Sequence, residues 1–445
     1  MKVVIAGAGD VGFHLARLLS DEAQDIVIID ENEDILEYAQ SHLDVMTLNG
    51  DATSLKTLRQ ADTKEADLVV AATHSEQTNI ITAVLAKKMG ATKTIARISK
   101  NEYLHPHVAN DFKNVGIDEL FSPRQLASKE IFRLIHQSSF TDMFEFEEGK
   151  FTLVGILVDD QCKLLNQSIR SGHHLDPDHQ SKIIAIQRNN ETIIPDSETT
   201  FHMNDHIYFL ATKSGIERIL NITGKEQVKI KNIMILGGSS IGEMTASMLE
   251  KSYNVKLIER DKEKCLKLAE SLTNTLILNA DGHNVEDLEE EGIDEMDAFI
   301  ALTGNSETNI ISSLVAKNHG VKKTIALVEN IDYIHLSQNI GVDTLINRKL
   351  IAANHIFKHI RKGTIKAITS IHGVDAQVIE YEVSIDSKIT KANIKELNLE
   401  EGIVVAGIIR NEEPILPIGD FHIEPKDKII VLAKPELISK VEKYF

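Results

Sequence analysis

Residues 3–12 read VVIAGAGDVG, in which an apolar run leads directly into three glycines spaced as GxGxxG. The short apolar run predicts a buried strand, and Val11, Leu15 and Leu18 then recur at helical spacing. A glycine-rich turn between a strand and a helix is typical of Rossmann-type dinucleotide-binding units. The stretch therefore predicts a mononucleotide or dinucleotide site at the start of the helix.

Each glycine has a separate task in such a turn. Gly7 permits the tight turn, Gly9 lets the backbone approach a pyrophosphate, and Gly12 allows close packing of helix on strand. Asp30 lies eighteen residues past Gly12, at the end of the next predicted strand. Its carboxylate can accept hydrogen bonds from ribose hydroxyls and would repel a 2′-phosphate. We therefore predict NAD or an adenine nucleotide rather than NADP, with its phosphates at the helix N-terminus.

The same pattern occurs twice in the chain. Residues 233–242 read IMILGGSSIG, and the third glycines, Gly12 and Gly242, are 230 residues apart. A duplicated unit explains this agreement, so any account of function must explain two such sites in tandem. The same offset aligns Asn-Gly-Asp at 49–51 with Asn-Ala-Asp at 279–281. It also aligns TNII at 78–81 with TNII at 308–311, and TIA at 94–96 with TIA at 324–326.

Each copy predicts an α/β fold with a doubly wound parallel sheet. Short apolar, β-branched runs are typical of strands that are buried on both faces, and helical patterns separate them. The fold class is therefore two Rossmann-like domains. In the first copy the predicted strands are Val3–Ala6, Ile26–Ile29, Val45–Leu48, Leu68–Ala72 and Thr94–Ile98.

A smaller motif follows each Rossmann-like unit. Predicted strands at 183–188, 192–195 and 205–210 reappear at 404–410, 415–417 and 427–432. Strands joined by polar turns predict a small α/β domain that is rich in hairpins. The predicted order is large, small, large, small, with boundaries at 1–137, 138–225, 226–363 and 364–445.

Three further residues belong to the predicted first site. Asp51 follows the third strand, where it could face the adenine or cap the next helix. Thr73 follows the fourth strand, beside the crevice. Arg97 ends the fifth strand, where it could meet phosphate or form a surface ion pair.

The second copy differs at positions that matter for binding. Gly237, Gly242 and Asp281 match their counterparts, but Glu259 replaces Asp30. In addition, Ser239 stands in place of Gly9 and Leu327 in place of Arg97. This site could bind a nucleotide less tightly, bind a different one, or remain empty.

Composition excludes several classes of protein. A net charge of −19 argues against nucleic-acid binding and against direct docking on an anionic membrane. No apolar run approaches the roughly 18 residues of a membrane span. The two cysteines, Cys162 and Cys265, are far apart and indicate neither a disulfide framework nor a zinc site. We expect a cytoplasmic protein whose membrane role, if any, goes through a protein partner.

The sequence favours binding over catalysis. A dehydrogenase needs a proton donor or acceptor and a domain that closes over the nicotinamide, whereas here the nucleotide unit simply begins again. His14 and His74 could be general bases, although a solvated or capping role is the simpler interpretation. The cluster His173, His174, Asp176, Asp178 and His179 could suggest a metal, but it has no counterpart in the second copy. We predict no catalytic residue and no metal.

Taken together, the GAGDVG, NGDAT, TNI and TIAR motifs and the duplicated small domain resemble the TrkA family across essentially the whole chain. Members of that family consist of two tandem RCK units, each with a Rossmann-like TrkA-N domain and a small TrkA-C domain. The resemblance implies a non-catalytic ring that binds NAD(H) and ATP/ADP and gates a membrane potassium-translocating subunit of the Trk type. Its nucleotide residues carry over to Gly7, Gly9, Gly12, Asp30, Asp51, Thr73 and Arg97, and in the second copy to Gly237, Gly242, Glu259 and Asp281.

The assembly is predicted from two helices with broad apolar faces. The faces exceed what one sheet should bury, which is typical of interfaces. We expect a homo-oligomer, a tetramer by family resemblance, at the inner face of the cell membrane through its partner. An NAD-dependent oxidoreductase and a free-standing nucleotide sensor with another partner are the alternatives. The faces comprise Ile80, Ile81, Val84 and Leu85, and Ile310, Ile311, Leu314 and Val315.

Overall fold

The computed structural model describes residues 1–20, 24–172, 180–189, 191–225, 229–330, 333, 341–357, 365–370 and 376–445. The chain divides into two compact units. One contains Met1–Ala127 together with the helix that begins at Arg348, and the other contains Ser128–Ile346 together with the C-terminal small domain.

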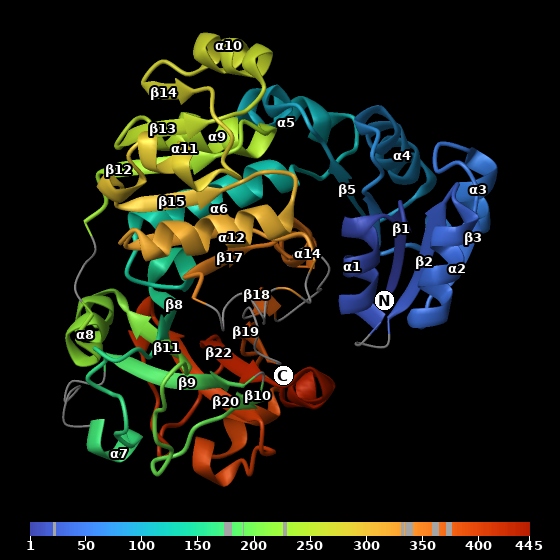
Figure 1. The fold of residues 1–445 in the computed structure, drawn as a ribbon. Coiled ribbons are helices and arrows are strands. Elements are labelled where there is room, and N and C mark those ends of the chain that lie inside the picture. The colour runs from blue at the N-terminus through green and yellow to red at the C-terminus, as the bar shows by residue number, and fades with distance from the viewer. Residues whose placement is uncertain are drawn as a thin grey trace. The chain divides into compact units, whose positions relative to one another are not determined.

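The first Rossmann domain is built on a six-stranded parallel sheet of order β3-β2-β1-β4-β5-β6 (Figure 1). The order reverses between β1 and β4, so a crevice opens at the carboxyl ends of these two strands. Residues 3–6 of the central strand β1 are all buried because helices cover both faces of the sheet. The strands are β1 (Lys2–Ala6), β2 (Asp25–Asp30), β3 (Met46–Asn49), β4 (Leu68–Ala71), β5 (Lys93–Arg97) and β6 (Glu119–Phe121).

Side-chain caps fix where the helices of this domain begin. Asn32 accepts hydrogen bonds from the amides of Asp34 and Ile35, and Ser75 accepts one from the amide of Thr78. These caps satisfy amides that would otherwise lack partners at the helix start. The helices are α1 (Asp10–Ser20), α2 (Glu33–His42), α3 (Leu55–Gln60), α4 (Glu76–Met89) and α5 (Pro106–Asn114).

The second Rossmann domain repeats this topology. Its six-stranded sheet has the order β14-β13-β12-β15-β16-β17, so the duplication in the sequence is a duplication of the fold. Together with the two small antiparallel sheets described below, it confirms the predicted fold class. The strands are β12 (Asn232–Leu236), β13 (Asn254–Ile258), β14 (Thr275–Leu278), β15 (Ala298–Ala301), β16 (Lys323–Leu327) and β17 (Thr344–Ile346), and the helices are α9 (Ser240–Leu249), α10 (Lys262–Ser271), α11 (Val285–Glu290) and α12 (Ser306–Asn318).

The helix that leaves each Rossmann sheet packs on the other Rossmann domain. After β6, α6 (Pro123–His136) reaches α9, where the hydroxyl of Thr245 donates to the hydroxyl of Ser128 at 3.1 Å. After β17, α14 (Arg348–Phe357) packs along α1, and Lys349 forms an ion pair with Asp10 at 2.8 Å. The two nucleotide-type domains are thus connected by an exchange of helices that the sequence did not predict.

Each small domain is a five-stranded sheet with antiparallel pairing, of order β10-β9-β11-β8-β7 in the first and β18-β19-β22-β20-β21 in the second. The short helix α7 (Ile169–Gly172) and the helix α8 (Lys213–Thr223) belong to the first domain, and α15 (Ile438–Val441) belongs to the second. The strands are β7 (Asp142–Phe146), β8 (Phe151–Leu157), β9 (Ser181–Arg188), β10 (Glu191–Ile193) and β11 (His206–Thr212), then β18 (Ile365–Ser370), β19 (Gln377–Glu382), β20 (Ile403–Arg410), β21 (Glu413–Ile415) and β22 (Lys428–Ala433).

The two small domains share one apolar core. Phe151 and Leu210 of the first belong to the same buried cluster as Ala406 and Ile430 of the second. A Cβ atom on Gly407 would stand 2.8 Å from Cδ2 of Leu210, so the two sheets approach too closely for a larger residue there. The small domains therefore pair within one chain.

The broad apolar face of α4 is partly covered within its own domain. Ile80 and Val84 pack against the core with Phe112 of α5. Ile81 remains 47% exposed, and its counterpart Ile311 on α12 is 61% exposed.

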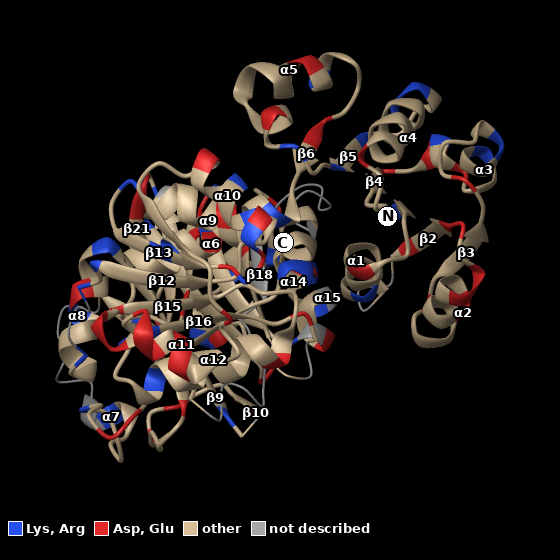
Figure 2. Cartoon of the chain, turned by 45° about the horizontal axis from the view of Figure 1, so that its top comes forward, with Lys and Arg blue, Asp and Glu red and all other residues tan. Residues whose placement is uncertain are grey.

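Acidic and basic residues are interspersed along the helices (Figure 2). Among the described residues, no helix is long and apolar enough to cross a membrane.

Candidate functional site

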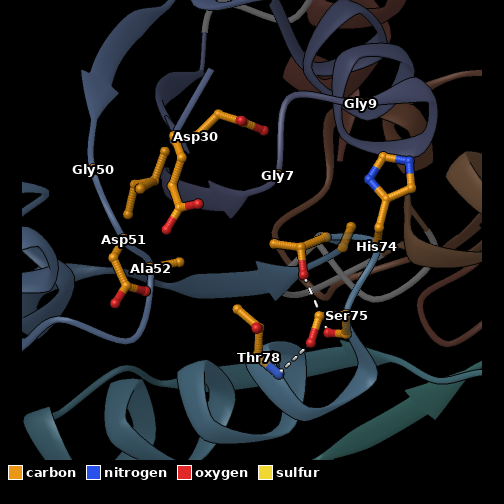
Figure 3. A pocket seen from close by; sticks show the side chains of 13 residues that line it. Gly7, Gly9, Asp30, Gly50, Asp51, Ala52, His74, Ser75 and Thr78 are labelled. Atoms are coloured by element: carbon orange, nitrogen blue, oxygen red, sulfur yellow. Dashed lines mark hydrogen bonds between the residues drawn. The ribbon is translucent and has the colours of Figure 1, made fainter. Parts of the chain in front are cut away.

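A pocket of about 260 Å³ opens at the carboxyl ends of the strands of the first Rossmann sheet (Figure 3). Five of the predicted site residues line it: Gly7, Gly9, Asp30, Asp51 and Thr73. They come from the ends of β1, β2, β3 and β4, so the crevice at the reversal of strand order brings them together.

Gly7 and Gly12 shape the glycine loop. Gly7 has a φ of +104°, a conformation that side chains disfavour. Gly12 does not line the pocket, but a Cβ atom there would lie 1.8 Å from the carbonyl oxygen of Gly7. Only glycine lets α1 begin this close to the loop, so Gly12 acts through packing.

Asp30 holds the loop at the floor of the pocket. Its Oδ2 accepts from the amide of Ala8 at 2.7 Å, and its Oδ1 accepts from the amide of Asn32 at 3.0 Å. A carboxylate has about four acceptor positions, so both oxygens retain the capacity to accept from a ligand hydroxyl.

Asp51 lines the pocket, and its side chain stabilises the turn that contains it through hydrogen bonds from Thr53. Its Oδ1 accepts from the amide and the hydroxyl of Thr53, both at 2.7 Å. The cap of α3 is Ser54, whose hydroxyl accepts from the amide of Thr57. Asp51 therefore does not itself cap the next helix.

The buried amide of Asn79 joins the ends of β4 and β5, and sequence analysis missed this role. Its Oδ1 accepts from the amide and hydroxyl of Thr73 at 2.8 and 2.7 Å, and its Nδ2 donates to the carbonyl oxygens of Thr73 and Arg97 at 3.1 and 2.9 Å. The second copy repeats the network, with Asn309 contacting Thr303 and Leu327. The repeated TN dipeptide was the signal that could have revealed it.

Arg97 lies half-buried at the end of β5 and is not among the residues lining the pocket. Burial, followed by the charges of Arg124 and Arg348, lowers the pKa of its guanidinium. These two arginines stand at the starts of α6 and α14, and the nearby carboxylate of Asp10 partly offsets them. Arg97 forms no ion pair with any residue that the structure describes. A guanidinium without an ion-pair partner among the described residues attracts anions.

A second pocket, of about 390 Å³, lies at the equivalent edge of the second Rossmann sheet. Gly237, Ser239, Glu259 and Asp281 line it, whereas Gly242 stands behind the loop. The position of Gly242 matches that of Gly12, because a Cβ atom there would lie 2.0 Å from the carbonyl oxygen of Gly237.

The loop of the second pocket differs in chemistry. The hydroxyl of Ser239 accepts from the amide of Gly242 at 3.3 Å and donates to the carbonyl oxygen of Leu302 at 2.9 Å. This hydroxyl occupies an amide at the start of α9, whereas Gly9 has no side chain that could do so. Leu327, in place of Arg97, is buried and apolar.

The acid of the second pocket keeps its role. Glu259 accepts from the amides of Gly238 at 3.0 Å and Asp261 at 2.9 Å, as Asp30 does in the first pocket. Beside it, the ring of His283 contacts Asp281 at 2.7 Å and the hydroxyl of Thr308 at 2.9 Å. The hydrogen bond from His283 lowers the pKa of Asp281.

The two histidines near the first pocket occupy different surroundings. His74 is exposed and lines the pocket, with Cε1 3.4 Å from the position that a Cβ atom of Gly9 would take. His14 lies on α1, and burial, with the charges of Lys349 and Arg17, lowers its pKa to about 4.

The histidine and aspartate cluster of the first small domain, at 173–179, lies outside the described residues. Within the parts of the chain that the structure describes, no group of three His, Cys, Asp or Glu side chains is placed to hold a metal ion.

Two Rossmann domains with glycine-loop pockets, each followed by a small antiparallel domain, give the chain the fold of tandem RCK domains. Solved structures support this fold: the GsuK RCK domain has a TM-score of 0.62 at 15% identity, covering 100% of this chain and 94% of that one. The GsuK channel has a TM-score of 0.64, also at 15% identity, covering 100% of this chain and 78% of that one.

Sequence comparison places the chain in a family. The TrkA-N domain model matches residues 3–123 and 233–348, and the TrkA-C domain model matches 153–224 and 378–445. The chain belongs to the TrkA family of Trk-system potassium uptake proteins, which confirms the resemblance seen in the sequence.

Curated relatives match over all or nearly all of their lengths. The Trk system potassium uptake protein TrkA homolog 1 of Methanosarcina mazei is 31% identical, covering 100% of both chains. TrkA of Vibrio alginolyticus is 32% identical, covering 100% of this chain and 98% of its own. The TrkA homolog of Archaeoglobus fulgidus is also 32% identical, covering 100% of both chains.

Proposed function

We propose that the chain is a nucleotide-binding regulatory subunit that controls potassium uptake by a membrane translocating subunit of the Trk type. The observation that carries this proposal is the pair of glycine-loop pockets in a chain whose second half repeats the first. Duplication adds a second binding surface, whereas an enzyme of this fold would need a substrate domain. The names of the curated relatives, all Trk-system potassium uptake proteins, support the choice of transport.

The proposed ligands are NAD(H) and ATP/ADP. The glycine loop and the start of α1 offer backbone amides to phosphate groups, and Asp30 offers acceptors to the ribose hydroxyls. Solved structures of GsuK, which share the fold, include one bound to NAD and one bound to ADP.

Each proposed binding residue has a stated role. In the first pocket the glycines shape the phosphate loop, Asp30 holds the ribose, and Asp51 and Thr73 face the ligand from β3 and β4. Arg97 meets the terminal phosphates from the end of β5. The proposed set is Gly7, Gly9, Gly12, Asp30, Asp51, Thr73 and Arg97, with Gly237, Gly242, Glu259 and Asp281 in the second pocket.

The exchanged helices supply a route from ligand to partner. Arg124 and Arg348 stand at the starts of α6 and α14 and act electrostatically on Arg97. A phosphate that pairs with these cations would lower their mutual repulsion and shift the helices. Because α6 and α14 lead toward the small domains, we propose that these helices transmit the ligand state among four domains, 1–137, 138–225, 226–363 and 364–445.

We further propose that the chain acts without catalysis, as a homo-oligomer, with the tetramer as the proposed state. Ile81 and Ile311 are exposed at equivalent positions of the two copies and supply candidate contacts between chains. The proposed location is the cytoplasm, at the inner face of the cell membrane through the translocating partner.

Affinity purification of the full chain from native membranes tests the proposal. Recovery of a potassium-translocating membrane subunit is the expected result. Consistent absence of such a partner would favour a free-standing sensor, and NADH oxidation that requires a small-molecule co-substrate would favour an oxidoreductase.

A further inference from the structure

The side chains that line the two pockets differ in charge: the first pocket is net negative, whereas negative and positive side chains balance in the second. The first contains three carboxylates, from Asp30, Glu31 and Asp51, and neither lysine nor arginine is among its lining residues. In the second pocket, two carboxylates, from Glu259 and Asp281, are accompanied by two cations from Arg260 and Lys264. An additional anionic group on the ribose of a ligand, beside these carboxylates, would therefore be repelled by the first pocket and accepted by the second.

Two substitutions at matched backbone positions produce this difference. The cap residues Asn32 and Asp261 align α2 with α10, because each accepts from the amides two and three residues further on. The residue before the cap is Glu31 in the first copy and Arg260 in the second. The residue three positions after the cap is Ile35 in the first copy and Lys264 in the second.

The carboxylate of Glu259 in the second pocket already accepts hydrogen bonds from the protein backbone. Glu259 is 8% exposed, and both of its oxygens accept backbone amides. Lys264 approaches one of these oxygens at 3.9 Å and offsets its charge. Arg260 is exposed and lines the pocket, and its carbonyl oxygen accepts from the side-chain amide of Asn279 at 2.9 Å. Its guanidinium forms no hydrogen bond or ion pair with any described residue.

In Rossmann domains, an arginine near the acid of the second strand can contact a phosphate on the ribose, and Arg260 lies next to that acid in the chain. In Rossmann domains the acid at the end of the second strand holds the ribose hydroxyls, and a nearby arginine accommodates a phosphate on the 2′-hydroxyl. The second pocket also has more room, since Gly304 takes the place of His74 and has no atom within 4 Å of an added Cβ.

We propose that the second pocket takes an adenine nucleotide that carries a phosphate on the 2′-hydroxyl of its adenosine ribose, while the first pocket takes the unphosphorylated form. This inference rests on the proposed nucleotide-binding function and specifies the ligand of the second pocket. One chain then binds two chemically distinct classes of adenine nucleotide, one in each pocket.

Calorimetric titration of the full chain with 2′-phospho-ADP-ribose and with ADP-ribose tests the proposal. We expect one site per chain to bind the 2′-phosphorylated compound about tenfold more tightly than ADP-ribose, the value of one charge-assisted contact. Arg260→Glu, which installs the residue of the first pocket, should remove this preference, because it should weaken binding of the 2′-phosphorylated compound far more than binding of ADP-ribose. The preference should also weaken as salt is raised.

A reciprocal variant in the first pocket and a control variant complete the test. Glu31→Arg should increase the affinity of the first pocket for the 2′-phosphorylated compound, and Asp30→Ala should leave the preferring site unchanged. If ADP-ribose binds but no site prefers the 2′-phosphate, or if Arg260→Glu retains the preference, the inference is wrong while nucleotide binding stands. If neither compound binds to the wild-type chain, both the inference and the proposed nucleotide function fail.

Discussion

The side-chain amide of Asn79 donates to the carbonyl oxygen of Arg97 at 2.9 Å, and through this bond α4 fixes the end of β5 beside the first pocket. Asn79 is 1% exposed and uses both ends of its amide, since it also binds Thr73 at the end of β4. The side chain therefore sets the spacing between two strand ends that the proposed ligand would contact.

Replacing this amide should cost stability and binding together. Asn79→Ala leaves polar groups of Thr73 and Arg97 without partners, so we expect a loss of roughly 2–3 kcal/mol in the free energy of unfolding. It should also weaken nucleotide binding at the first pocket. Thermal unfolding and calorimetry measure the two effects. The matched variant Asn309→Ala should cost similar stability and spare the first pocket, so equal loss of first-pocket affinity in both variants would contradict this account.

Asp30 is expected to bind the ribose. Asp30→Ala should weaken binding of ADP by about 1–3 kcal/mol, the usual value of a charge-assisted hydrogen bond. Because Asp30 also holds the amide of Ala8, loss of affinity alone could reflect a disturbed loop. The informative comparison is ADP against 2′-deoxy-ADP and 3′-deoxy-ADP by calorimetry. Wild type should discriminate against a deoxy ligand, and the variant should not; discrimination that survives in the variant would remove Asp30 from the ribose site.

The exposed isoleucines of α4 and α12 should contribute to assembly. Ile81→Glu with Ile311→Glu would bury carboxylates without partners if these positions lie in an interface. We expect a smaller assembly in light scattering and loss of potassium regulation, with unchanged folding because both side chains are exposed in the single chain. The double variant Ile81→Ala with Ile311→Ala is a milder control. A well-folded Glu variant of unaltered mass and activity would show that these residues make no essential contact.

Lys323 should make stability depend on pH. Its ammonium is buried and donates to the carbonyl oxygen of Phe140 at 2.6 Å and the hydroxyl of Thr344 at 2.9 Å. Burial lowers its pKa from 10.5 to about 8, although Asp343 and Asp142 oppose this shift. Between these values the unfolded chain binds the proton that the folded chain has released, so stability rises with pH in this window. Below pH 8 the buried charge keeps its full cost.

Chemical denaturation at several pH values checks this expectation. From pH 8 to pH 10.5, wild type should gain up to roughly 3 kcal/mol relative to Lys323→Met. Lys93→Met, at the half-buried equivalent position of the first copy, is the control and should show a smaller difference. Parallel pH profiles for wild type and Lys323→Met would contradict the assignment.

Local patterns in the sequence predicted the two Rossmann sheets because strand burial and the glycine turn depend on neighbouring residues. The sequence also predicted that Gly7, Gly9 and Asp30 meet at one pocket, since the carboxyl ends of parallel strands lie at the same edge of the sheet. The exchange of α6 and α14 and the pairing of the small domains could not be predicted in this way. Both depend on which apolar faces meet across hundreds of residues, and the apolar pattern of a strand or helix does not name its partner.

Asn79 shows a different limit of sequence reasoning. A polar residue inside a helix usually faces solvent, so the position of Asn79 in α4 did not by itself predict that it turns inward to join two strands. Only the repetition of the TN dipeptide in the second copy pointed to this residue. Arg97 is similar, because the charges that surround it come from α6 and α14, which lie far away in the sequence.

The central claim is that nucleotide held by the first pocket sets the rate of potassium uptake, with Arg97 distinguishing ATP from ADP. The direct measurement is potassium flux into vesicles that contain the translocating subunit and this chain, with ATP, ADP or no nucleotide. The account predicts different rates with ATP and ADP for wild type, and equal rates for Arg97→Ala. Wild-type flux that is the same with ATP, with ADP and without nucleotide would contradict it.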